Sequence, residues 1–294
     1  MKSGFVAILG EANVGKSTLL NAILKEKVSI VSPKPQTTRN KILGIYNDDE
    51  CQIAFIDTPG IHKTKNKLDE YMSKAISTAK SDVDVILYVI DGTKKITDHT
   101  IENLNKYTSG AQVILVVNKI DDTTYDKLYP ELSKCNGLEN IKDIVPVSAK
   151  KSKNLDELIK VIKGYLKEDV KYFDDDVYTD VSIKFLVSEI IREKALWLLQ
   201  DELPHGIAVE ISRFNEDAPI CEIDADIILE KASHKAIVIG KNGTMLKEIG
   251  TKARHDIEKL LAKKVMLKLF VKVREDWRNS SSSIKSLGYN SQDL

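Results

Sequence analysis

The chain has 294 residues, a length typical of two domains, and its 42% of hydrophobic residues suffices for packed cores. It carries 44 basic and 44 acidic residues, so the overall charge indicates neither a nucleic acid nor a membrane as partner. The three cysteines are scattered, which argues against a zinc site or a disulfide framework and fits a reducing cytosol. We expect no signal peptide, and no apolar run approaches the ~18 residues that a spanning helix needs.

The first part of the chain alternates apolar strands with amphipathic helices. Near-continuous apolar runs such as Val113–Val117 are typical of strands buried on both faces. The alternation predicts an α/β domain over residues 1–170, with a mostly parallel sheet and helices on both faces. We expect strands at 5–9, 41–46, 51–56, 83–90, 111–117 and 141–147, and helices near 16–25, 67–80, 97–107, 124–134 and 154–167.

The first strand runs into a glycine-bounded turn and then a helix, the context of a phosphate-binding P-loop. Glycines let the backbone curl so that several N–H groups point at phosphate oxygens, and the helix adds its positive N-terminus. Lys16 is expected to reach the β- and γ-phosphates, and the Ser17 hydroxyl to ligate Mg²⁺. The expected nucleotide-binding residues are Gly10, Glu11, Ala12, Asn13, Val14, Gly15, Lys16, Ser17 and Thr18.

A second motif, Asp57-Thr58-Pro59-Gly60-Ile61, closes the strand at 51–56. Ligands in parallel sheets bind beyond the carboxyl ends of the strands, where this motif lies. Asp57 is expected to hold Mg²⁺ through its water shell, and the Gly60 N–H to reach the γ-phosphate. We count Thr58, Pro59 and Ile61 with the nucleotide-binding residues.

Two further motifs are expected to determine which nucleotide base is bound: Asn118-Lys119-Ile120-Asp121 and Ser148-Ala149-Lys150. A carboxylate only accepts hydrogen bonds, and guanine offers two donors side by side, so Asp121 can bind both. Adenine would leave Asp121 unpaired, at a cost of ~1–3 kcal/mol or more, so the site should reject ATP. The Ala149 N–H can point at guanine O6.

Taken in this order, the motifs resemble those of the translation-factor class of GTPases. The resemblance implies that the loop Pro35–Arg39 carries a threonine that closes on Mg²⁺ and the γ-phosphate. The spacing leaves Thr37 and Thr38 as candidates, of which we take Thr38. The expected metal-binding residues are then Ser17, Thr38 and Asp57, and the catalytic residues Lys16, Thr38, Asp57 and Gly60.

Ile61 stands where Ras-like enzymes carry the glutamine that orients the attacking water. Its side chain can neither donate nor accept a hydrogen bond, so intrinsic hydrolysis should be slow or another group must align the water. Asn13 in the P-loop, together with a hydrophobic residue after Gly60, resembles a subgroup of GTPases that uses a potassium ion. We therefore hypothesise potassium-stimulated hydrolysis.

An acidic stretch at 171–181 interrupts the periodicity and is expected to be a solvated linker rather than a metal site. A second domain, 182–294, follows it, and we expect Trp197 in its core. The expected elements are a helix at 182–203, strands at 207–214 and 220–229, a short apolar element at 236–239, a helix at 244–263, a strand at 265–273 and a tail at 277–289 with room for a short helix.

This order, with Gly240-Lys-Asn-Gly243 before the long helix, resembles the type II KH domain, an α+β fold that binds single-stranded RNA. Residues 201–230 contain one basic and nine acidic side chains, whereas residues 231–278 contain thirteen basic and five acidic ones. This asymmetry favours one phosphate-attracting face. The expected RNA-binding residues are Lys235, Ile239, Gly240, Lys241, Asn242, Gly243, Lys247 and Arg254.

A GTPase domain followed by a type II KH domain resembles the Era family of bacterial GTPases over essentially the full length. Segments outside the nucleotide site carry the resemblance too, notably Ser188–Lys194, Val238–Gly243 and Phe270–Trp277. The resemblance implies binding of GTP, GDP and Mg²⁺, binding near the 3′ end of 16S rRNA, and assistance in 30S subunit maturation. Ala12, where the family usually has proline, and the Lys-Asn pair in the second glycine turn depart from its pattern.

The resemblance also implies a cytoplasmic protein with peripheral contact to the inner face of the cell membrane, and we expect a monomer. Three other functions stay open at this point. They are a metabolic NTPase or nucleotide kinase, a membrane-surface GTPase, and a non-catalytic guanine-nucleotide sensor in cell-cycle control.

Overall fold

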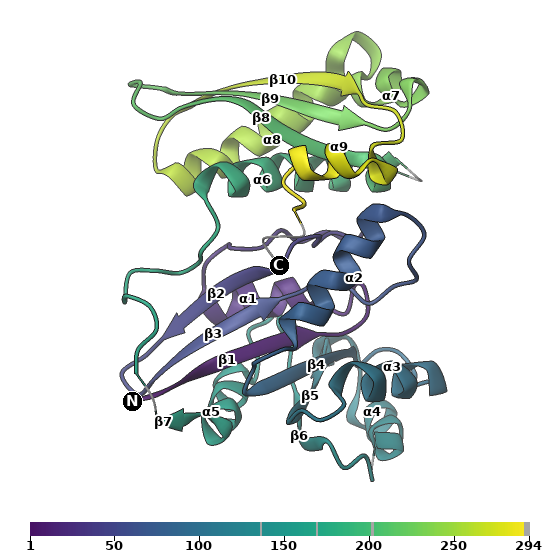
Figure 1. Cartoon of the computed structure of the whole chain (residues 1–294), viewed down its shortest axis with the longest axis vertical. Helices are drawn as coiled ribbons and strands as arrows, with labels where there is room; N and C mark the ends of the chain where they lie inside the picture. The colour runs from purple at the N-terminus through teal and green to yellow at the C-terminus, as the bar shows by residue number, and fades with distance from the viewer. Residues whose placement is uncertain (136, 169, 201–202, 291–294) are drawn as a thin grey trace.

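The computed structural model describes residues 1–135, 137–168, 170–200 and 203–290. Over these residues the chain forms two sheet-based domains, one above the other in Figure 1. The first holds a sheet in the order β2-β3-β1-β4-β5-β6, in which β2 runs antiparallel to β3 and β7 pairs with β1. Its strands are β1 (Lys2–Leu9), β2 (Ile42–Asn47), β3 (Cys51–Asp57), β4 (Val85–Asp91), β5 (Val113–Asn118), β6 (Ile141–Pro146) and β7 (Lys167–Glu168).

Helices cover both faces of this sheet, because its central strands are apolar on both sides: every residue of β4 and β5 is buried. The predicted P-loop α/β fold with a mostly parallel sheet is therefore confirmed. The helices are α1 (Lys16–Leu24), α2 (Lys67–Ala79), α3 (Asp98–Thr108), α4 (Tyr125–Leu132) and α5 (Leu155–Tyr165).

The second domain packs helices on a three-stranded sheet in the order β10-β9-β8, with β8 antiparallel and β10 parallel to β9. This is the predicted α+β arrangement, and it is confirmed. Its elements are α6 (Ile183–Leu198), β8 (Ile207–Asn215), β9 (Cys221–Leu229), α7 (Lys235–Ile239), α8 (Thr244–Leu261), β10 (Val265–Val273) and α9 (Ser281–Ser286).

Helix α6 ends earlier than the sequence predicts, and one of its residues is placed differently. Leu199 is extended, so the helix stops at Leu198, and Leu203–Gly206 forms a separate turn. The prediction that Trp197 belongs to the core is wrong, because its side chain is 56% exposed. Its indole N–H donates to Val31 O at 2.9 Å, so the tryptophan lies at the rim of the interface between the two domains.

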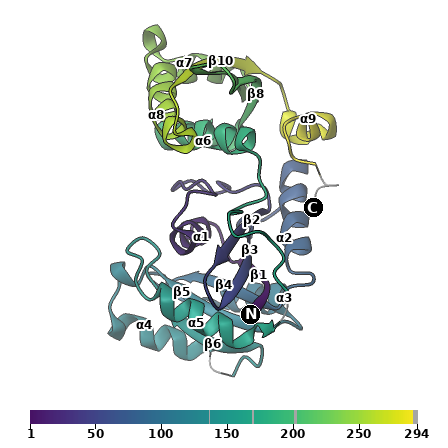
Figure 2. The same cartoon turned by 90° about the vertical axis from the view of Figure 1, so that its left-hand side faces the viewer.

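The two domains meet along two contacts. Helix α6 lies on the side of the second domain that faces the first, and α9 lies beside α2 in both views (Figures 1 and 2). At the second contact a buried apolar cluster crosses between the domains. Its members are Leu68, Tyr71 and Met72 from the first domain and Ala208, Ile228, Trp277, Ile284 and Tyr289 from the second.

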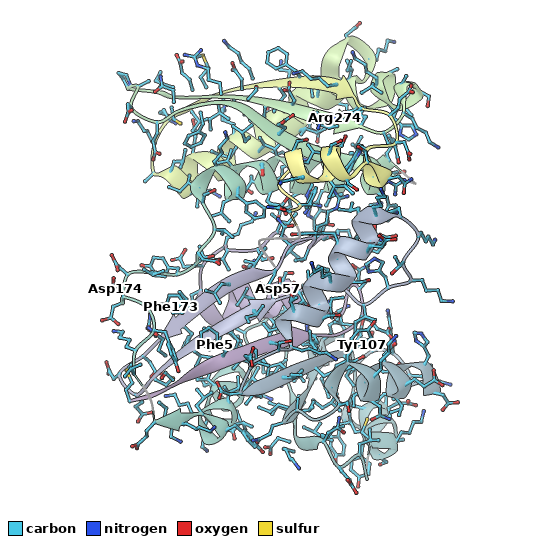
Figure 3. All side chains as sticks on the ribbon, in the orientation of Figure 1. Phe5, Asp57, Tyr107, Phe173, Asp174 and Arg274 are labelled. Atoms are coloured by element: carbon cyan, nitrogen blue, oxygen red, sulfur yellow. The ribbon has the colours of Figure 1, made fainter. Side chains whose placement is uncertain are left out.

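The connecting segment packs on the first domain instead of standing free in solvent. The Gln52 side chain accepts from the N–H groups of Tyr172 and Phe173 and donates to Phe173 O. Figure 3 shows Phe173 and Asp174 at the edge of the first domain. Further on, the Thr179 hydroxyl donates to Leu43 O at 2.6 Å. Asp174, Asp175 and Asp176 of this segment are exposed.

Parallel register brings the carboxyl ends of the central strands to one edge of the first sheet. Ile8 is paired with Asp57, and Asp91 with Asn118. The segments that follow β1, β3, β4 and β5 therefore gather there, as expected for a ligand site. None of the helices in the described residues is long and apolar enough to cross a membrane.

Candidate nucleotide site and nucleic-acid interface

The P-loop curls tightly between β1 and α1. Gly10 has φ +144° and Gly15 has φ +96°, and a Cβ on Gly15 would lie 2.3 Å from Asn118 Nδ2. Both positions therefore require glycine. The Lys16 ammonium donates to the carbonyls of Gly10 and Glu11 at 3.1 and 2.9 Å. Burial lowers the pKa of Lys16 to about 8, an effect that Asp57 partly offsets.

A cavity of about 60 Å³ lies at this loop. Not every residue of the predicted motif faces it. The Glu11 carboxylate points instead toward α3, where Asn103 Nδ2 donates to it at 3.3 Å, and the Thr58 hydroxyl donates to Ile8 O. Of the predicted residues, those lining the cavity are Ala12, Asn13, Gly15, Lys16, Ser17, Thr18, Thr38 and Gly60.

Three oxygen-bearing side chains gather where a metal ion is expected. Ser17 Oγ donates to Asp57 Oδ2 at 2.6 Å and lies 2.7 Å from Thr38 Oγ1. Asp57 is fully buried, and burial raises its pKa. Among the described residues its Oδ1 has no hydrogen-bond partner. A buried, incompletely paired carboxylate next to the Ser17 hydroxyl, which in turn contacts that of Thr38, fits Mg²⁺, which prefers oxygen ligands.

The structure distinguishes the two threonines of the segment at 32–41. Thr38 lies against Ser17, whereas the Thr37 hydroxyl donates to Lys34 O at 2.6 Å. Asn13 also contacts this segment, since its Nδ2 donates to Pro33 O at 2.9 Å. The segment thus lies directly against the P-loop.

The two base motifs lie together at the ends of β5 and β6. Asn118 Nδ2 donates to Val14 O at 2.9 Å, and its Oδ1 accepts from Ala149 N at 3.0 Å. Ser148 Oγ donates to Asp121 Oδ1 at 2.6 Å, and this hydrogen bond lowers the pKa of Asp121. Asp121 is therefore held as a charged acceptor. Ile120 packs at the apolar core, and Lys150 is exposed.

Asp91 belongs to this site and was missing from the sequence prediction. Lys119 Nζ donates to Asp91 Oδ2 at 2.7 Å and to Asn13 O at 2.8 Å, which ties the base motif to the P-loop. Asp91 is the last residue of β4. The rule that ligands bind beyond strand ends could have identified it, although Asp91 is not part of a longer sequence motif. Ser29, which donates to Asp57 Oδ2 at 3.0 Å, carries no such signal.

In the second domain, the glycine turn lies between α7 and α8. Gly240 and Gly243 both have φ +76°, and Asn242 has φ +53°. A Cβ on Gly240 would lie 2.8 Å from Met245 N, whereas a Cβ on Gly243 would meet nothing within 4 Å. The outer side of this turn is therefore open to a close approach by another backbone.

A groove of about 350 Å³ begins at Gly243 and runs between α8 and β10. Apolar side chains from β10 form one wall, and Lys247 and Arg254 from α8 add positive charge. Lys235 and Lys241 are exposed beside the turn, and Ile239 is partly buried. A narrow apolar floor with cationic rims suits unstacked bases and their phosphates. The sequence prediction missed Leu267 and Leu269, whose pattern is that of any half-buried strand.

Helix α6 of the second domain contacts the segment at 32–41 and the residue before it. Arg192 Nη2 donates to Thr37 O, and Glu193 Oε1 accepts from Val31 N at 3.0 Å. Arg39, which is 1% exposed, donates to Ile207 O and His205 O and lies over the Trp277 ring. The segment that carries Thr38 is therefore also part of the domain interface.

Comparisons with known proteins agree with this geometry. A model of the 50S ribosome-binding GTPase family matches residues 5–119, and a KH domain model matches residues 202–278. The chain is 52% identical to GTPase Era of Clostridioides difficile and 49% identical to that of Clostridium kluyveri, over 98% of this chain and 99% of each relative.

Two solved structures match 98% of this chain and 99% of their own, at 41% identity and a TM-score of 0.95. One is a variant of Aquifex aeolicus Era bound to GDP and AlF₄⁻. The other is Era in complex with MgGDPNP and nucleotides 1506–1542 of 16S ribosomal RNA.

Proposed function

The chain belongs to the Era family of GTPases, and on this basis we propose that it is a GTP-controlled RNA-binding switch. Its first domain hydrolyses GTP to GDP and phosphate. Its second domain binds the 3′ region of 16S rRNA, and the protein assists assembly and maturation of the 30S subunit. A metabolic nucleotide kinase and a non-catalytic sensor do not fit membership of this family.

The proposed roles in hydrolysis follow from the first-domain contacts. P-loop N–H groups and Lys16 hold the phosphates, and Ser17, Thr38 and Asp57 hold Mg²⁺. The metal ion neutralises charge that develops on the transferred phosphoryl group. The Gly60 N–H contacts the γ-phosphate, and Asp121 accepts from the guanine edge.

One observation supports the proposed link between nucleotide state and RNA binding. Neighbouring residues of one segment face different domains: the Thr38 hydroxyl lies against Ser17, and the Thr37 carbonyl accepts from Arg192 of α6. When Thr38 closes on Mg²⁺ and the γ-phosphate of GTP, the neighbouring Thr37 carbonyl is therefore expected to move as well, which changes its contact with Arg192 of α6. This supports a mechanism in which GTP orients the turn at 240–243 for RNA and hydrolysis releases the RNA.

RNA binding is tested with Gly243→Asp, which adds a charge at the open side of the turn without a clash. We expect labelled single-stranded RNA matching the 3′ end of 16S rRNA to bind at least ten-fold more weakly to this variant, with a GTP analogue present. Gly137→Asp is the matched control, since Gly137 also has positive φ and open space around it. Equal affinity of wild type and Gly243→Asp would contradict the proposal.

We further propose that potassium stimulates hydrolysis through Asn13. Asn13 lines the nucleotide cavity. The Ile61 side chain offers no polar atom to the attacking water. Turnover should be several-fold faster in KCl than in NaCl at matched ionic strength, and Asn13→Ala should remove the difference. Equal turnover of the wild type in both salts would refute this role.

The remaining proposals concern organisation and location. We propose a monomer with domains at 1–170 and 182–294, joined by a segment at 171–181 that packs on the first domain.

We place the protein in the cytoplasm, with peripheral contact to the inner face of the cell membrane. The exposed lysines of α8 and β10 support such contact, because they would attract anionic headgroups. Pelleting with anionic liposomes at varied salt tests it, and no pelleting at low salt would exclude it.

A further inference from the structure

The turn after β3 contains a hydrogen-bond network that the nucleotide motifs do not include. His62 Nδ1 lies 2.7 Å from Gly60 O, and its Nε2 lies 3.2 Å from Asp69 Oδ1. Gln36 Nε2 donates to the same Asp69 oxygen at 2.9 Å. Asp69 is 1% exposed and the His62 side chain 14%, so solvent competes little with these contacts.

Both ring nitrogens of His62 face an acceptor, one a carbonyl and the other a carboxylate. A neutral imidazole has a single N–H donor, so both contacts are hydrogen bonds at the same time only in the imidazolium. Burial lowers the pKa of His62, but the hydrogen bonds to Asp69 and to the Gly60 carbonyl outweigh it, and the net direction is upward. The charge makes both hydrogen bonds stronger than those of a neutral ring.

The peptide between Gly60 and Ile61 is held at both ends. Its carbonyl oxygen is fixed by His62, and its N–H donates to Gly10 O at 3.1 Å. A Cβ on Gly60 would lie 2.6 Å from Ala12 Cα, so the turn already lies against the P-loop backbone. Little rotation of this peptide is left once His62 is in place.

Asp69 is itself held in place by the start of α2. Its Oδ2 accepts from Lys65 N at 2.8 Å, and its own N–H donates to the N-cap residue Asn66 at 3.0 Å. The carboxylate therefore ties a helix to two segments, one through Gln36 and one through His62. Gln36 and Gly60 both line the nucleotide cavity, on different segments.

We propose that His62, Asp69 and Gln36 are positioning residues for GTP hydrolysis, which hold the segments at 32–41 and 57–66 together and fix the Gly60–Ile61 peptide. The Ile61 side chain has no polar group with which to orient a water molecule. Alignment at the γ-phosphate therefore depends on the backbone around Gly60, and this network fixes that backbone.

Steady-state and single-turnover kinetics of Asp69→Asn and His62→Ala test the proposal. We expect kcat for GTP to fall about ten-fold or more, because small displacements at a reacting centre are costly. KM and the Kd for GDP should change less than two-fold. Lys63→Ala is the matched control, because Lys63 is an exposed neighbour outside the network, and it should retain the wild-type kcat.

A kcat within two-fold of the wild type in both variants would overturn the proposal. So would a parallel loss of kcat and of GDP affinity, which indicates a merely structural role. If Asp69→Asn does not fold, the proposal is tested by comparing kcat of His62→Ala, Gln36→Ala and the double variant. Both side chains act through Asp69, so the double variant should be about as slow as the slower single variant. If the fold-loss of kcat in the double variant equals the product of the two single fold-losses, the side chains act independently and the network is contradicted.

Discussion

We expect Asp121 to determine the choice of base through one chemical property, since an ionised carboxylate cannot donate a hydrogen bond. The Ser148 hydroxyl fixes one of its oxygens at 2.6 Å and lowers its pKa, which keeps it ionised at neutral pH. Guanine matches this acceptor with two adjacent donors. Xanthine carries a carbonyl in place of the exocyclic amine and should be rejected by the wild-type protein.

Asp121→Asn should therefore reverse this preference. The asparagine amide offers one donor and one acceptor, which match xanthine and mismatch guanine. We expect GTP affinity to fall by about 1–3 kcal/mol, or roughly five- to 150-fold, and xanthosine triphosphate to bind more tightly than GTP. Competition against a fluorescent guanine nucleotide measures both affinities. An unchanged preference for GTP would show that another group reads the base.

The ion pair of His62 and Asp69 also predicts a pH dependence of stability. The pKa of His62 is raised in the folded protein, so the ion pair contributes fully to folding stability at pH values below the unfolded-state pKa of about 6.5. This contribution is lost as the pH rises through the higher pKa of the folded state. Wild type should exceed His62→Ala by about 1 kcal/mol in unfolding free energy near pH 6. The difference should shrink by pH 9, as measured by urea unfolding. A difference that is constant or grows with pH would contradict the pairing.

At the scale of single elements, α6 is unusual because it is buried on two sides. It packs on its own sheet, and it presents Arg192 and Glu193 to the first domain. This explains why helical periodicity misplaced Trp197. A helix with two buried faces has no single apolar stripe, and a large aromatic residue on it belongs as readily to the interface rim as to the core.

Trp197 should therefore report the nucleotide state. Its indole donates to Val31 O, one residue before the segment that carries Thr37 and Thr38. We expect its emission to change when a GTP analogue replaces GDP, and Trp197→Phe to reduce the change. The other tryptophan, Trp277, is fully buried under Arg39 of the same segment, so the change that remains in the variant measures its contribution. An equal change in the variant would place the moving contact elsewhere.

The strand and helix order, the P-loop and the base motifs were predictable because each depends on residues close together in the chain. Their geometry follows from local rules: glycines with positive φ, a strand end, a helix start. The network of Gln36, His62 and Asp69 was not predictable in this way. It joins side chains far apart in sequence, and each of them alone is typical of a polar loop or a first helical turn.

The short strand β7 and the packed connecting segment were missed for a related reason. The acids at 174–176 predict a solvated linker, and they are indeed exposed. The segment is held mainly through its backbone, which bonds to the Gln52 side chain and to Ile45 N, and through the Thr179 hydroxyl, which donates to Leu43 O. Composition reports side chains and gives little information about such backbone contacts.

At the scale of the whole molecule, both segments expected to respond to the γ-phosphate end at the second domain. The segment at 32–41 meets α6 and buries Arg39 among second-domain groups. The helix α2, which follows the segment at 57–66, packs on the tail that carries α9. We therefore expect a rearrangement at the nucleotide to reach the second domain along two routes, one through the buried Arg39 and Arg192 and one through α2.

The central claim is that nucleotide state controls RNA binding through this interface. The most direct measurement is the Kd of the 16S 3′-end RNA with GDP and with a GTP analogue, for wild type, Arg39→Ala and the exposed control Lys160→Ala. We predict at least ten-fold tighter binding with the GTP analogue in wild type and Lys160→Ala, and a ratio near one in Arg39→Ala. Equal affinities in the two nucleotide states of the wild-type protein would contradict the claim.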